Sequence, residues 1–129
     1  MQISPAIMAN KYTIVPAAQY PFDRLDALSR YTFGLIFDRW KLSARAETWR
    51  AWVDDMGIYC VYDQRDLANE LGITAPTVRR CLDALEREGL LKRERTGKRG
   101  ACRYYPTAKA RVSFDATDGQ REYALEHST

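Results

Sequence analysis

Apolar side chains recur at helical spacing in three stretches of the chain, and each stretch predicts an amphipathic helix. The first helix is expected to begin near Ser29, which can act as an N-cap, and to end at about Lys41. One face of this helix would carry Phe33, Ile36, Phe37 and Trp40. Residues 43–52 would follow as a further helical turn or as a loop.

The second and third helices are separated by a short turn. Asp63 is a suitable N-cap for the second helix, and Gly72 ends it because glycine takes a positive φ without steric penalty. Thr74 caps the third helix, which is expected to continue to about Glu88 and to stop at Gly89. The two helices would share one apolar core, formed by Leu67, Leu71, Ile73, Val78, Leu82, Leu85 and Leu90.

Short runs of β-branched and aromatic residues predict the strands. Residues 58–62 (IYCVY) form one candidate strand, and residues 11–15 (KYTIV) form a short strand or an extended segment. Further along, LLKRER and ACRYY are joined by TGKRG, a turn rich in glycine and positive charge. This arrangement predicts a β-hairpin.

Two helices joined by a tight turn and followed by a hairpin predict a winged helix-turn-helix, a mainly α fold with a small β-hairpin as its wing. Residues 29–106 would form this domain, with residues 1–28 as an N-terminal arm and residues 107–129 as a C-terminal tail. The length of 129 residues fits one domain with a single modest core.

Positive charge is concentrated in the part of the chain that holds this motif. The net charge is only +3, yet residues 73–105 carry nine Lys and Arg against four Asp and Glu. Residues 1–72 and residues 106–129 each carry a slight acidic excess. The uneven distribution indicates a localised anionic partner. Charge alone leaves open the alternative that this is an ordinary solvated helix face.

The cysteine and histidine content argues against a metal site. Cys60, Cys81 and Cys102 form no CxxC pair, and His127 is the single histidine. Neither a disulfide framework nor a zinc site is supported, so we expect no metal and no other cofactor. Cys81 and Cys102 are interpreted as small buried apolar residues.

Catalysis and membrane insertion find no support in the sequence. The histidine has no cysteine or serine nucleophile in a recognisable arrangement, and the adjacent Asp54 and Asp55 are interpreted as solvated turn residues. We therefore expect that the protein is not an enzyme. No run approaches the roughly 20 apolar residues of a membrane span, and no secretory signal is recognisable. A cytoplasmic protein without membrane contact is expected.

Two arginines stand side by side near the start of the third helix. In a recognition helix the N-terminal residues approach base edges, whereas flanking residues hold phosphates. The face opposite the apolar side is centred on Pro76, Arg80, Asp83 and Arg87. We therefore expect Arg80 to read a base, because a guanidinium can bond O6 and N7 of guanine together. Arg79 and Thr77 are expected to contact phosphates.

Other residues of the same helix are assigned smaller roles. Ala75 and Pro76 are candidates for apolar contact with a thymine methyl group. Asp83 would either orient Arg79 or Arg87 at helical spacing or accept a hydrogen bond from a cytosine amino group.

The hairpin tip also carries candidate DNA ligands. Lys98 and Arg99 suit a wing that reaches into a minor groove or along the DNA backbone. The alternative is a charged hairpin tip on an ordinary soluble protein. Arg103 is compatible with either interpretation.

Three stretches together resemble the N-terminal domain of plasmid replication initiator A proteins. These are LIFDRWKLS at 35–43, WVDDMGIY at 52–59, and DLANELGITAPTVRRCLDALEREGLLKRERTGK, within a similarity that covers roughly residues 12–106. The helix-turn-helix stretch is shared by many bacterial regulators, so the first two stretches select the initiator family.

The resemblance implies a bacterial winged-helix domain that binds repeated sites at a plasmid-type replication origin, commonly as a homodimer. By position, the residues facing double-stranded DNA would be Thr74 to Thr77, Arg79, Arg80, Lys98 and Arg99. Dimer contacts would come from the arm or the tail. Family members continue into a C-terminal domain that engages replication proteins, and this chain ends soon after the wing. It is therefore expected to be either a piece of such a protein or a DNA binder that cannot start replication alone.

Two other functions remain as alternatives. The helix-turn-helix is also similar to that of GntR-type transcriptional regulators, but their PGxxLPSE stretch is replaced here by YCVYDQRD. A winged helix can also serve as a protein–protein interaction module. The local positive charge and the arginine pair favour DNA over this module.

Overall fold

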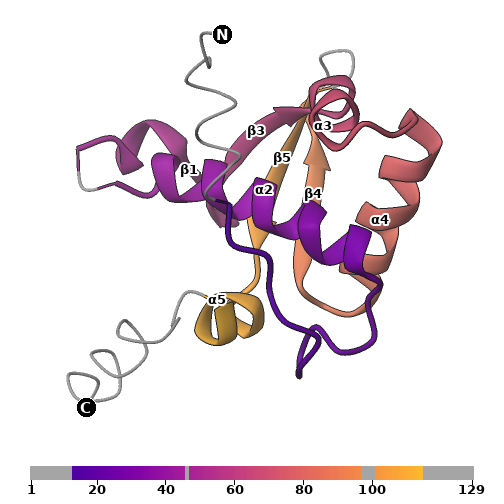
Figure 1. Ribbon diagram of the computed structural model, residues 1–129. Coiled ribbons are helices and arrows are strands. Elements are labelled where there is room, and N and C mark those ends of the chain that lie inside the picture. The colour runs from indigo at the N-terminus through magenta and orange to yellow at the C-terminus, as the bar shows by residue number, and fades with distance from the viewer. Residues whose placement is uncertain (1–12, 46, 97–100, 115–129) are drawn as a thin grey trace, which may run out of the picture.

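The computed structural model describes residues 13–45, 47–96 and 101–114 (Figure 1). Its helices are α2 (Ala27–Ser43), α3 (Gln64–Leu71), α4 (Ala75–Arg87), α5 (Ala108–Phe114) and the 3₁₀ helix η1 (Trp49–Trp52). Its strands are β1 (Val53–Asp54), β2 (Gly57–Ile58), β3 (Cys60–Asp63), β4 (Leu91–Arg95) and β5 (Ala101–Pro106). The element order confirms the predicted winged helix-turn-helix, with α3 and α4 as the helix pair and β4–β5 as the wing.

The wing belongs to a larger sheet than the sequence indicates. Strand β5 lies in the middle of a three-stranded antiparallel sheet, between β3 and β4. Cys60 pairs with Tyr104 on one side of β5, and Lys92 pairs with Tyr105 on the other. Helix α2 packs against β3, β5 and α4 (Figure 1).

The strand expected at 58–62 is divided in two. Residues Gly57–Ile58 form β2, which pairs with β1 in a separate two-stranded ribbon, and β3 begins only at Cys60. The chain leaves the ribbon at Tyr59, whose backbone N–H donates to the carbonyl of Trp52. No strand forms at the described residues 13–15.

The predicted N-cap of the first helix is wrong by three residues. Asp26, not Ser29, is the N-cap of α2: its Oδ1 accepts a hydrogen bond from the backbone N–H of Ser29 at 2.8 Å. Ser29 is 1% exposed and lies within the first turn, so it takes part in the packed face of α2. A carboxylate just outside the helix is the better acceptor for the free N–H groups of that turn.

The predicted caps of the other two helices are confirmed. The Asp63 side chain accepts from the backbone N–H of Arg65 at 2.7 Å, and the Thr74 side chain accepts from that of Thr77. Gly72 ends α3 in the left-handed conformation, with φ at +69°. These three local signals fix the sharp reversal between α3 and α4.

One aromatic cluster joins the two ends of the described chain to α2. The ring centroid of Phe114 lies 5.0 Å from that of Phe37, 5.5 Å from that of Phe33 and 6.0 Å from that of Phe22. Phe22 and Phe114 belong to the segments expected as arm and tail, so both segments contribute to the core. All three cysteines are free and buried, as expected for Cys81 and Cys102.

Gly34 allows the N-terminal segment to lie directly against α2. A Cβ atom at this position would lie 2.7 Å from the carbonyl oxygen of Ile14. Nearby, the Thr13 hydroxyl donates to Asp38 at 2.7 Å, and Arg30 donates to the carbonyl of Pro16 at 3.2 Å. Residues 13–16 are therefore attached along α2 by the hydrogen bond between the Thr13 and Asp38 side chains and by contacts to the carbonyls of Ile14 and Pro16.

We expect Gly34→Ala to lower Tm and to expose residues 13–16. Alanine is favoured over glycine within a helix by up to about 1 kcal/mol, but here the added methyl group would overlap a backbone carbonyl that cannot rotate away. Thermal unfolding and hydrogen exchange at residues 13–16 would measure both effects. Asn69→Ala, at an exposed position of α3, is the control for helix propensity. A higher Tm for Gly34→Ala would contradict this interpretation.

Candidate nucleic-acid interface

Helix α4 has one face in the core and one face in solvent. Its buried residues are Val78, Cys81, Leu82, Ala84 and Leu85. Its other side borders a shallow hollow lined by Pro76, Arg79, Arg80, Asp83, Ala84 and Arg87. All of these lining residues except Ala84 are exposed. The structure therefore brings the predicted α4 residues together on one accessible surface, which we call the α4 outer face.

The first turn of α4 is fixed by its cap. The hydroxyl groups of Thr74 and Thr77 are hydrogen-bonded to each other at 2.9 Å, and Thr74 also accepts from the backbone N–H of Thr77 at 3.4 Å. Ala75 is half-buried and Pro76 is exposed. The predicted phosphate ligand Thr77 thus shares its hydroxyl with the cap, at the positive end of the helix dipole.

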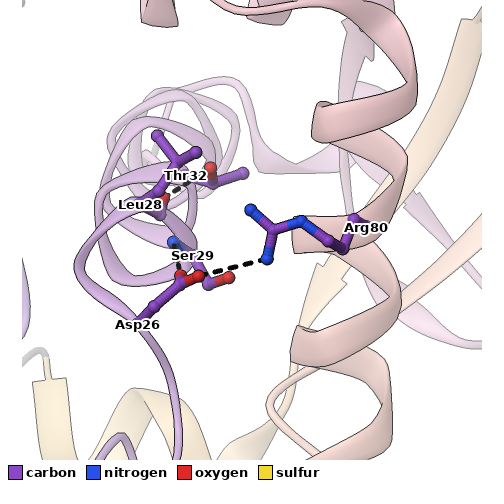
Figure 2. A network of polar contacts seen from close by, with 5 residues as sticks. All are labelled: Asp26, Leu28, Ser29, Thr32 and Arg80. Atoms are coloured by element: carbon purple, nitrogen blue, oxygen red, sulfur yellow. Dashed lines mark hydrogen bonds and ion pairs between the residues drawn. The ribbon is translucent and has the colours of Figure 1, made fainter.

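Arg80 is held by a residue that the sequence analysis did not identify. Its Nη1 donates to Oδ2 of Asp26 at 3.1 Å across the α2–α4 interface, as Figure 2 shows. Both side chains remain about half exposed, at 57% for Arg80 and 50% for Asp26. The hydrogen bonds from Ser29 and then from Arg80 lower the pKa of Asp26 below its ordinary value. The carboxylate is therefore ionised at neutral pH.

Arg79 differs from its neighbour. Its side chain is exposed, and neither it nor Arg87 makes an ion pair with another residue in the described part of the chain. The same holds for the exposed Lys92 and Arg95 on β4, which the sequence analysis did not single out. These four cations are solvated, so they can approach an anion without first losing a partner.

The expected role of Asp83 as a partner of Arg79 or Arg87 is wrong. Asp83 instead pairs with Arg93 of β4, and Nε of Arg93 also lies 2.6 Å from Oε1 of Glu86. Asp83 and Glu86 are three residues apart, so they project from adjacent turns toward the same strand. Arg93 therefore links the wing to α4, an interaction that neither helical spacing nor charge counting could predict.

Arg103 is directed toward the β1–β2 ribbon. Its Nη1 donates to Oδ2 of Asp54 at 2.7 Å, and its guanidinium lies 4.3 Å from the ring centre of Tyr59. The Tyr105 hydroxyl donates to the same carboxylate oxygen. Arg103 thus has a partner within the protein, and its contact with DNA stays a prediction. Lys98 and Arg99 lie outside the described residues.

Asp54 is more than the solvated turn residue that was expected. Besides these two partners, its Oδ1 accepts from the backbone N–H of Met56 at 2.8 Å. The Tyr105 hydroxyl contributes most to lowering the pKa of Asp54, and the backbone N–H of Met56 and Arg103 add to the effect. Burial is the main reason that the pKa of Tyr105 rises to about 12. Asp54 therefore attaches the β1–β2 ribbon to β5 through Arg103 and Tyr105.

We expect Asp54→Ala to lower Tm by several degrees at neutral pH, because it leaves the Tyr105 hydroxyl and Arg103 without their acceptor. The adjacent Asp55→Ala should leave Tm unchanged and is the matched control. Because folding lowers the pKa of Asp54, its stabilisation is present above the ordinary value of 3.8 and is lost as the pH falls through the folded-state pKa. Thermal unfolding at a series of pH values should show the two variants converging in acid. A constant difference down to low pH would contradict this.

The sequence and the structure were both compared with known proteins. Residues 40–100 match the family model of the Crp-like helix-turn-helix domain. No curated protein matches the sequence. Among solved structures, the N-terminal domain of a DNA-binding protein superposes with a TM-score of 0.58 at 20% identity, covering 98% of this chain and 92% of that one.

Two further solved structures show the same likeness. A Rep–DNA complex gives a TM-score of 0.57 at 21% identity over 97% of this chain and 93% of that one. An MDR initiator gives a TM-score of 0.58 at 20% identity, covering 97% of this chain and 96% of that one. This chain shares the fold of these domains. The resemblance to replication initiator N-terminal domains is thus confirmed at the level of the fold, over nearly the whole chain.

The described residues of this winged helix hold neither a membrane-spanning helix nor a cluster of metal ligands. None of its helices there is both long enough and apolar enough to cross a bilayer. In the same residues, no three His, Cys, Asp or Glu side chains are grouped so that they could hold a metal ion.

Proposed function

We propose that this domain binds double-stranded DNA, with α4 in the major groove and the β4–β5 wing beside it. The observation that carries the proposal is the α4 outer face: one side of the helix is fully packed, while Arg79, Arg80 and Arg87 project from the other. A helix with this division can enter a groove without exposing the core. The solvated cations of β4, Lys92 and Arg95, extend the positive surface onto the wing.

We further propose that the DNA sites are repeats at a plasmid-type replication origin and that the protein binds them as a homodimer. The likeness to an MDR initiator and to the protein of a Rep–DNA complex supports this proposal. The arm at 1–28 or the tail at 107–129 is the proposed dimer contact. Replication proteins would be reached through a domain beyond this chain, in the bacterial cytoplasm.

Within this function we distinguish residues that contact bases, which we call readers, from residues that contact phosphates, which we call anchors. Arg80 is the proposed reader of a guanine, because a guanidinium can bond O6 and N7 together. Arg79 and Thr77 are proposed to hold phosphates, and Ala75 and Pro76 are proposed to make apolar contact with a thymine methyl group. Lys98, Arg99 and Arg103 are the proposed ligands from the wing.

A transcriptional regulator is the second candidate. The match of residues 40–100 to a Crp-like helix-turn-helix domain favours it, since this range contains the whole helix pair α3–α4. The two candidates use the same protein surface and differ in the arrangement of their DNA sites.

Selection of bound duplexes from a random pool tests both candidates. Enriched direct repeats would support an origin binder, and an enriched palindrome would support a regulator. Failure to enrich any sequence, together with an affinity that does not change with salt, would overturn DNA binding in favour of a protein–protein module. A DNA-binding surface should instead lose affinity steeply as salt rises, with a slope of about −0.9 per neutralised phosphate.

A further inference from the structure

Asp26 is fixed in space by the start of α2. It follows the buried Leu25, and its Oδ1 accepts from the backbone N–H of Ser29 at 2.8 Å. Its backbone carbonyl accepts from the N–H of Arg30 at 3.1 Å. Because both its side chain and its backbone are tied to the first turn, the carboxylate cannot move independently of α2.

The second carboxylate oxygen of Asp26 faces α4. Oδ2 accepts from Nη1 of Arg80 at 3.1 Å, so one carboxylate caps α2 and also holds an arginine of the recognition helix (Figure 2). The two residues are 54 positions apart in the chain and meet because α2 packs against α4. The contact is thus a product of the tertiary fold.

Among the cations of the α4 outer face, this restraint distinguishes Arg80. In the described part of the chain, Arg79 and Arg87 have no comparable partner. A long arginine side chain without a partner samples many rotamers, and a base contact requires one of them. A guanidinium has five N–H donors in a planar fork, so engagement of Nη1 leaves the donors of Nε and Nη2 available.

We infer that Asp26 is a positioning residue for base readout by Arg80. It holds the guanidinium on the α2 side of the α4 outer face, and this orientation selects the base pair that the remaining donors reach. The inference rests on the proposed function, since it gives one residue of that surface a defined geometry. It also assigns a role in sequence preference to a residue outside the helix-turn-helix.

Two simpler roles for Asp26 make different predictions. If Asp26 only caps α2, its replacement changes stability and leaves sequence preference intact. If it acts only as a negative charge near the DNA, its replacement strengthens binding to every duplex by the same factor. A positioning role alone changes the ratio of affinities between two duplexes that differ at one base pair.

The experiment compares the full chain with Asp26→Asn, Arg80→Ala and the double variant. Asparagine is an equally good N-cap and keeps an acceptor for the Ser29 N–H, so α2 retains its start. The probes are the duplex selected from a random pool and a second duplex altered at the base pair where Arg80→Ala loses discrimination. Dissociation constants are measured for both, and thermal unfolding confirms that each variant is folded. If Asp26→Asn does not fold, Asp26→Ser replaces it under the same criteria, because serine is also a good N-cap.

We expect Asp26→Asn to reduce discrimination between the two duplexes about fivefold or more, at the lower end of what one bidentate base contact provides. In the Arg80→Ala background the same change should have no effect on the ratio. Equal changes on both duplexes, or improved discrimination, would overturn the positioning role while DNA binding stands. If the unaltered protein enriches no duplex, the proposed function fails, and the inference fails with it.

Discussion

Phe33→Ala is expected to lower the free energy of unfolding by about 3–5 kcal/mol, a large part of the stability of a domain of this size. Phe33 is 0% exposed, and its ring contacts Phe22, Phe37 and Phe114. These neighbours come from the segment before α2, from α2 itself and from α5. The substitution would therefore leave a cavity where three segments meet, and partial collapse cannot fill it without moving a helix.

Chemical denaturation monitored by circular dichroism would measure this loss. Val112→Ala is the control, because Val112 lies on the same small helix as Phe114 but is highly exposed. Its effect should stay within about 0.5 kcal/mol. Similar effects of the two substitutions would mean that the aromatic cluster does not hold the ends of the domain together.

Arg80→Ala is expected to cost about tenfold or more in affinity for the selected duplex while leaving binding to unrelated duplexes nearly unchanged. The adjacent Arg79→Ala should instead weaken binding to all duplexes by a similar factor and reduce the salt slope by about 0.9. The reason is geometric: the Arg80 guanidinium is hydrogen-bonded to Asp26, whereas Arg79 is solvated and makes no ion pair with another described residue.

Titrations of the two variants with the selected duplex and with unrelated duplexes, at several salt concentrations, would separate these roles. The two substitutions lie at adjacent positions and each removes one positive charge, so a difference between them is not an effect of net charge. Circular dichroism should show the same helix content for both. Equal losses on every sequence for both variants would refute the division between reader and anchor. If only Arg79→Ala lost affinity in a sequence-specific manner, Arg79 would be the reader and Arg80 the anchor.

Local signals predict the helix-turn-helix well and the contacts between elements poorly. The boundaries of α3 and α4 follow from Asp63, Gly72 and Thr74, which act on the few residues next to them. The start of α2 cannot be located from the sequence, because two possible N-cap acceptors, Asp26 and Ser29, both stand near it. Only the packing of Ser29 into the helix decides between them.

The contacts that shape the candidate interface join residues far apart in the sequence. Asp26 and Arg80 are separated by 54 positions, and Asp54 and Arg103 by 49. Each pair depends on how α2 meets α4 or how the β1–β2 ribbon lies beside β5. One sequence contains no signal for such pairs, because every charged residue has several partners of opposite sign at comparable separation. The pairing of β3 with β5 also joins residues far apart in the sequence, so the strand predicted at 58–62 could not be assigned to the wing sheet.

The wing has little freedom to swing relative to α4. Strand β5 is hydrogen-bonded on both sides, and Arg93 ties β4 to Asp83 and Glu86. In the proposed complex with DNA, a helix and a hairpin at fixed spacing would not adjust to a groove of different width, so the duplex would have to adapt. The curvature of the duplex and the stiffness of its base steps would then contribute to recognition at positions that no side chain contacts.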